Sequence, residues 1–64
     1  MLTVKVMSAN GGEEIHDGNS VGFNPKNKSI HVSGLDQAIL LKEDEVAYVM
    51  NQNGKTVSVY YGKL

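Results

Sequence analysis

The side chains best suited to chemistry in this 64-residue chain are two histidines and a short run of acids. Glu13, Glu14, His16 and Asp17 lie close together, and in a strand Glu14 and His16 would share one face. His31 could join them from a neighbouring strand to give a zinc-type site with nitrogen and oxygen ligands. We favour the alternative, a solvated and charged strand edge that discourages aggregation. We therefore predict no metal and no cofactor, and keep His16 and His31 only as candidate ligands.

A catalytic nucleophile is not predicted. The chain has no cysteine, and the nearest match to a nucleophile elbow, Gly18-Asn19-Ser20-Val21-Gly22, lacks the strand-to-helix context that such an elbow needs. A chain this short also has little room to shield a pocket from water. We therefore predict a non-enzymatic protein with no catalytic residue.

Two turn-like segments are candidates for binding a small anionic ligand. Gly11 and Gly12 can present backbone N–H groups, and Lys26, Asn27 and Lys28 would add positive charge. If the two segments meet, within a chain or between copies, they could hold an anionic metabolite or a nucleotide. The alternative is that both segments are simply turns.

The elements that must position these residues are clearest at residues 45–61, which are predicted to form one β-hairpin. Asn53-Gly54 lies between two runs of β-branched and aromatic residues, and this pair favours a two-residue type I′ loop. That loop pairs Met50 with Val57, Tyr48 with Val59 and Val46 with Tyr61, and we expect this wholly apolar face to be the core face. The alternative is a three-residue loop with Gly54 in a bulge, which places Tyr48 and Met50 opposite Ser58 and Thr56.

The other face of the same hairpin is mixed and is the candidate interface. It carries Ala47, Val49, Ser58 and Tyr60. Tyrosine suits an interface because it joins a rigid apolar ring to a polar tip. We expect these residues to bind another copy of the chain or another protein.

The segment at residues 48–57 resembles the C-terminal hairpin of small uncharacterised phage or prophage proteins. Its sequence is Tyr-Val-Met-Asn-Gln-Asn-Gly-Lys-Thr-Val. The resemblance covers about a quarter of the chain and carries over no catalytic or binding residue. It implies a context, because very small phage accessory proteins commonly act stoichiometrically, by binding a host protein or by sequestering a small molecule.

Two more hairpins are predicted upstream. Residues 2–8 alternate with period two and turn at Asn10-Gly11, which places Ile15 opposite Val6. Farther on, a loop at residues 25–28 places Phe23 opposite Ile30 and Val21 opposite Val32, with Asn27 in the left-handed region.

Residues 37–42 are apolar enough for a buried strand, which we favour, but they also suit part of a helix at residues 35–44. The expected fold is therefore an all-β domain spanning residues 1–64. In it, a small antiparallel meander of five or six strands curls into an SH3-like barrel. The alternative is an α+β fold with one short helix near residues 35–44.

Composition sets the expected partners and compartment. A domain of this size without disulfides is near the lower limit for folding alone, so a homo-oligomer is expected. The chain has no arginine, which argues against nucleic-acid binding because arginine is the usual bidentate ligand of phosphate and guanine. No apolar run suits a signal peptide or a membrane span. The expected location is the cytoplasm, or the host cytoplasm if the protein is phage-encoded.

Overall fold

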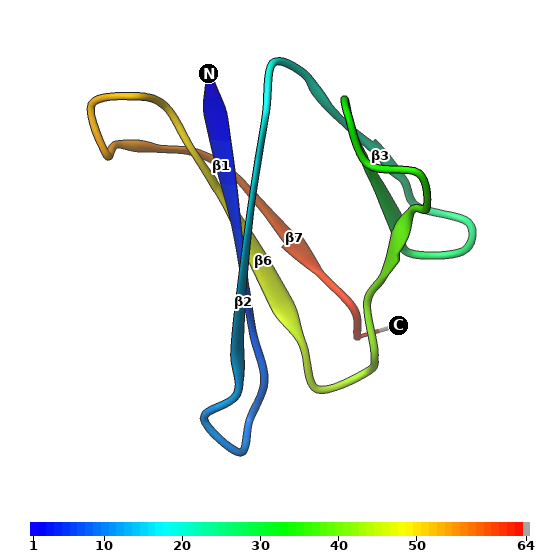
Figure 1. Ribbon diagram of the computed structural model, residues 1–64. Helices are drawn as coiled ribbons and strands as arrows, with labels where there is room; N and C mark the ends of the chain where they lie inside the picture. The colour runs from blue at the N-terminus through cyan, green and yellow to red at the C-terminus, as the bar shows by residue number, and fades with distance from the viewer. Residues whose placement is uncertain (64) are drawn as a thin grey trace.

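The computed structural model describes residues 1–63, and these form an all-β fold without a helix (Figure 1). All strand pairs are antiparallel, in a four-stranded sheet of order β2-β1-β6-β7 and a three-stranded sheet of order β3-β4-β5. The strands are β1 (Leu2–Met7), β2 (Glu13–Gly18), β3 (Val21–Asn24), β4 (Ser29–Val32), β5 (Ile39–Leu40), β6 (Val46–Met50) and β7 (Thr56–Tyr61). The all-β class is thus confirmed, with seven strands instead of five or six. The larger sheet is not a simple meander, because β1 lies between β2 and β6.

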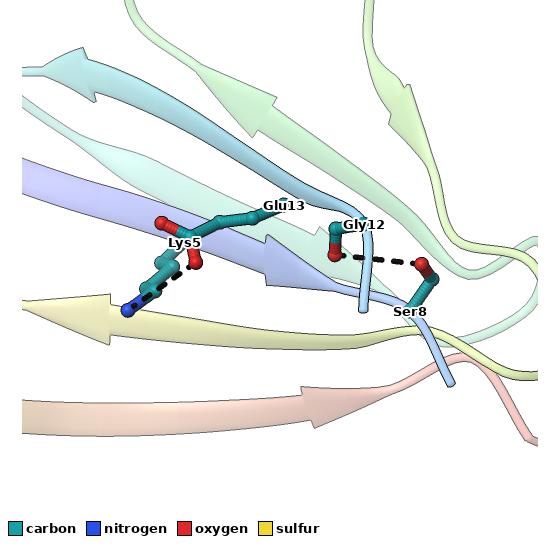
Figure 2. A network of polar contacts seen from close by, with 4 residues as sticks. All are labelled: Lys5, Ser8, Gly12 and Glu13. Atoms are coloured by element: carbon teal, nitrogen blue, oxygen red, sulfur yellow. Dashed lines mark hydrogen bonds and ion pairs between the residues drawn. The ribbon is translucent and has the colours of Figure 1, made fainter. Parts of the chain in front are cut away.

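The β1–β2 hairpin is predicted correctly in place but wrongly in register. Ser8 N donates to Gly12 O and Gly11 N donates to Ser8 O, so the loop has three residues and Gly11 takes a φ of 91°. Figure 2 shows the additional contact between the Ser8 hydroxyl and the Gly12 carbonyl oxygen across this loop. The extra loop residue places Ile15 opposite Lys5 instead of Val6. A slip of one residue reverses the faces of a strand, and Ile15 therefore points away from the core.

A bend between β2 and β3 carries the chain from one sheet to the other. The Ser33 hydroxyl accepts hydrogen bonds from the backbone N–H groups of Asn19 and Ser20, at 2.8 and 3.0 Å. Gly18 is required here, because a Cβ at this position would lie 2.5 Å from Val32 Cγ1. The bend lets one continuous segment contribute to both sheets.

The β3–β4 hairpin has the predicted register. Val21 pairs with Val32 and Phe23 pairs with Ile30, across a loop of residues 25–28. The left-handed residue is Lys28, with a φ of 55°, and not Asn27 as we expected.

Residues 35–44 form no helix, and the buried strand that we favoured at residues 37–42 is reduced to two residues, of which Leu40 is 66% exposed. Ile39 and Leu40 form β5 against β4, and the remainder of this segment is turn and loop. Lys42 N donates to Glu45 Oε1 at 2.7 Å, which fixes the tight connection into β6. The alternative α+β fold is therefore wrong, and none of the described residues forms a helix that could span a membrane.

The core lies between the two sheets. Its fully enclosed side chains are mostly small and β-branched: Val4, Val6, Ile30, Val32, Leu41, Ala47 and Val49. Phe23 and Tyr60 close one side of it with stacked rings, whose centroids are 4.3 Å apart at an interplanar angle of 11°. Burial of these side chains from both sheets is the main favourable term in folding.

Candidate interaction surface

The face of the four-stranded sheet that points away from the core, here called the outer face, carries apolar side chains from all four strands. Strand alternation gives this face every second residue of each strand. Its apolar members are Met7, Ile15, Val46, Tyr48, Met50, Val57, Val59 and Tyr61. Four of them are conspicuously exposed: Ile15, Val57, Val59 and Tyr61.

The predicted assignment of faces in the last hairpin is wrong. Of the candidate interface residues, Ala47 and Val49 are buried in the core, and Tyr60 stacks on Phe23. Ser58 is half-buried on the same inner face, opposite Val49. These four residues are therefore not available as an external surface, and the side chains expected in the core lie outside.

Pairing with β1 explains the reversal. Val4 pairs with Val49 and Val6 pairs with Ala47, so the inner face of β6 continues the inner face of β1. This contact joins strands that are far apart in the sequence and cannot be seen in the hairpin alone. Small residues on the inner face also allow the second sheet to pack closely.

The hairpin register combines both predicted loops. Asn51 N donates to Lys55 O and Gly54 N donates to Asn51 O, so the loop has three residues with Gly54 at a φ of 82°. Met50 accordingly pairs with Thr56, as the three-residue alternative predicts. An irregularity between Val49 and Met50 then restores the two-residue register, and Tyr48 pairs with Val59.

The outer face divides into a charged half and an uncharged half. On β1 and β2, Lys5 Nζ and Glu13 Oε2 form an ion pair of 3.7 Å (Figure 2). The Thr3 hydroxyl also donates a hydrogen bond to the Asp17 carboxylate. On β6 and β7, by contrast, no outer-face residue is an aspartate, glutamate, histidine, lysine or arginine. Contiguous apolar surface of this kind is typical of a site of protein contact.

Within the uncharged half, β7 is the most accessible part. Val57, Val59 and Tyr61, here called the β7 surface, expose 52%, 37% and 59% of their area. β7 pairs with β6 on one side, and no strand within residues 1–63 pairs with its other side. The β7 surface therefore combines apolar side chains with an open strand edge.

The histidines are not brought together. His16 Nε2 lies 3.4 Å from Glu14 Oε2 on the inner face of β2, as their shared face predicts. His31 pairs with Gly22 in the other sheet and is exposed. Among residues 1–63, no three histidine, aspartate or glutamate side chains gather as metal ligands.

Two open grooves flank the junction of the sheets. One, of about 560 Å³, has Glu14, His16, Lys42 and Glu45 among its lining residues, and the other, of about 530 Å³, includes His31. The first groove is lined by acids, a histidine and a lysine, but within residues 1–63 these acids and the histidine are not gathered closely enough to hold a metal ion.

The proposed anion-binding segments are also apart. The turn with Gly11 and Gly12 joins β1 to β2 at one end of the large sheet, whereas residues 26–28 lie in the turn of the small sheet, well separated from it (Figure 1). Lys28 Nζ lies 6.0 Å from the centroid of the Phe23 ring, close to the limit for a cation–π contact. Within one chain, these residues do not form a joint site.

Comparison of the chain with protein-family models, with curated proteins and with solved structures gave no match. The assignment of the candidate surface therefore rests on the geometry of the fold alone. Sequence reasoning missed Val57, Val59 and Tyr61 because it assigned the more apolar face of the last hairpin to the core, and it missed Ile15 because it expected a two-residue loop between β1 and β2. The signal that could have found them is size, since Ala47 and Ser58 are the small residues that a close sheet contact requires.

Proposed function

We propose that this protein is a non-enzymatic β interaction module that self-associates and binds another protein through the β7 surface. The observation that carries the proposal is the exposure of Val57, Val59 and Tyr61 on an uncharged strand with an open edge. Tyrosine is enriched at the desolvated centre of protein interfaces, and the two valines beside Tyr61 add apolar area around it. The chain is small, and association would enlarge the apolar area removed from water.

We also propose that the two sheets together form an SH3-like barrel. Support comes from the bent β2–β3 segment, which links the sheets on one side. On the other side, the chain after β5 approaches the end of β7, where a Cβ on Gly62 would lie 1.9 Å from Lys42 O. Neither sheet closes on itself among residues 1–63. Small barrels of this type serve many functions, so the function is argued from the β7 surface.

The resemblance to phage accessory proteins supplies the proposed setting, a host cytoplasm in which the module binds a host protein in a fixed ratio. The alternative, an oligomer that sequesters a small anionic ligand, would need Gly11, Gly12, Lys26, Asn27 and Lys28 to meet between copies. No observed contact favours that arrangement.

The test is the solution mass by light scattering over a dilution series, for the unmodified protein and two variants. Tyr61→Lys places a charge on the β7 surface, whereas Leu40→Lys removes a similarly exposed side chain, 66% against 59%, from the other sheet. We expect the unmodified protein and Leu40→Lys to exceed the 6.9 kDa of one chain at high concentration, and Tyr61→Lys to stay at that mass. A single-chain mass for the unmodified protein throughout, or equal masses for the two variants, would contradict the proposal.

A further inference from the structure

The two outer strands of the four-stranded sheet differ sharply in charge. β2 carries Glu13, Glu14, His16 and Asp17, whereas β7 carries no ionisable side chain other than its two tyrosines. Charged residues on an edge strand oppose pairing with a further strand. Only the β2 edge has this protection, and the β7 edge is free to accept a partner strand.

The hydrogen bonds of β7 define which of its backbone groups are available. Gly62 N donates to Glu45 O at 2.9 Å, just beyond the last pair of the β6–β7 ladder. Backbone bonding alternates along an antiparallel pair, so Ser58 and Tyr60 direct their N–H and C=O groups toward β6. The N–H and C=O groups of Val59 and Tyr61 therefore point away from the sheet.

We propose that β7 of a second copy pairs with this edge, antiparallel, around a two-fold axis at Tyr60. This inference rests on the proposed self-association and specifies its geometry. Val59 of each copy then pairs with Tyr61 of the other, and all the outward N–H and C=O groups of both residues are bonded. The two outer faces join into one continuous apolar surface, because directly paired residues project to the same side.

Charge favours this arrangement over the alternatives. Lys55 and Lys63 flank β7, and in the register centred on Tyr60 they do not lie opposite one another. An in-register parallel pairing of two β7 strands would set each lysine beside the same lysine of the second copy, which is unfavourable. Pairing of β7 with β2 would desolvate Glu13 and Asp17, and its repetition would build an open filament instead of a closed dimer.

The interface is short, because the Lys42 carbonyl lies against Gly62 at the end of β7. An interface of limited area forms a weak and reversible complex. We therefore expect a dimer that dissociates on dilution.

Proline substitution tests the edge directly, because proline removes a backbone N–H and is tolerated in a strand only where that N–H faces outward. Val59→Pro should keep the native circular dichroism and raise the dimer dissociation constant about tenfold or more. Val59→Thr, which keeps the N–H and the β-branched shape, should dimerise like the unmodified protein. Ser58→Pro removes an inward N–H and should lose the native spectrum.

Two further variants separate this geometry from self-association in general. Val59→Lys keeps the N–H but charges the edge, and it should be a folded monomer even if Val59→Pro does not fold. Tyr48→Ser changes the outer face away from the edge and should leave the dimer intact. If the unmodified protein is a monomer, the proposed self-association fails together with this inference. A different result would overturn the edge pairing alone. In that case the unmodified protein dimerises, Tyr48→Ser abolishes the dimer and Val59→Lys does not. The two copies would then stack through their outer faces.

Discussion

Both faces of the four-stranded sheet carry apolar side chains, but these differ in size and in accessibility to water. The inner face carries Val4, Val6, Ala47 and Val49, which the second sheet covers almost completely. The outer face carries larger side chains, of which Ile15 and Tyr61 expose 57% and 59% of their area. The contrast shows that the buried face of a hairpin is chosen by the shape of the element that packs on it, and not by apolarity alone.

The largest expected effect comes from placing the same charge on each face. Val4→Asp buries an unpaired carboxylate among fully enclosed side chains, and we expect a loss of at least about 4 kcal/mol in the free energy of unfolding, enough to unfold a domain of this size. Ile15→Asp, on the outer face, should change it by less than about 0.5 kcal/mol. Urea unfolding followed by circular dichroism measures both. Similar losses in the two variants would mean that the faces are not distinguished as described.

A smaller effect is expected from adding a single methyl group on the inner side. Gly62→Ala would bring a Cβ within 1.9 Å of the Lys42 carbonyl oxygen, and this backbone cannot move aside easily. We expect a loss of about 2 to 3 kcal/mol. Gly22→Ala is the matched control, since no atom lies within 4 Å of the position that its Cβ would take and its φ is not positive. Thermal melting should separate the two variants clearly, and equal melting temperatures would refute the close approach at Gly62.

The adjacent tyrosines of β7 give the finest comparison. Tyr60→Ala removes the stack on Phe23 and should cost about 2 kcal/mol, whereas Tyr61→Ala should cost less than about 1 kcal/mol. A double-mutant cycle with Phe23→Ala should show coupling of about 0.5 to 1.5 kcal/mol for Tyr60 and none for Tyr61. The assignment of the two rings to opposite faces fails if Tyr61 couples to Phe23 instead.

Local sequence patterns predicted the elements well. Alternation located β1, and the pattern around Pro25 gave the β3–β4 register correctly. Both Asn-Gly loops were expected to have two residues, yet each has three, with Gly11 and Gly54 in the left-handed region. The two loop types share the same residue preferences, so composition alone does not separate them.

The consequences of that shared error differ between the two hairpins. In the β1–β2 hairpin the shift of register by one residue continues along both strands and turns Ile15 outward. In the β6–β7 hairpin the irregularity between Val49 and Met50 cancels the shift, so the rest of the ladder has the predicted register. The remaining error, the choice of face, arose from a pairing between β1 and β6 that spans most of the chain. The alternation of a single hairpin carries no trace of such a long-range pairing, and the one local indication of the inner face is the small size of Ala47 and Ser58.

The central place of β1 bears on how the protein is made. β1 precedes the other described strands in the chain, but its partner β6 comes about 40 residues later. At translation rates of about 5 to 20 residues per second, β1 waits on the order of seconds for that partner. Until β6 is available, a β1–β2 hairpin lacks the neighbouring strand and the second sheet that bury Val4 and Val6 in the folded chain, and an isolated hairpin is only marginally stable in water. The acids of β2 are present from the time that this hairpin is made, so the charge that opposes pairing at the finished edge does not depend on β6.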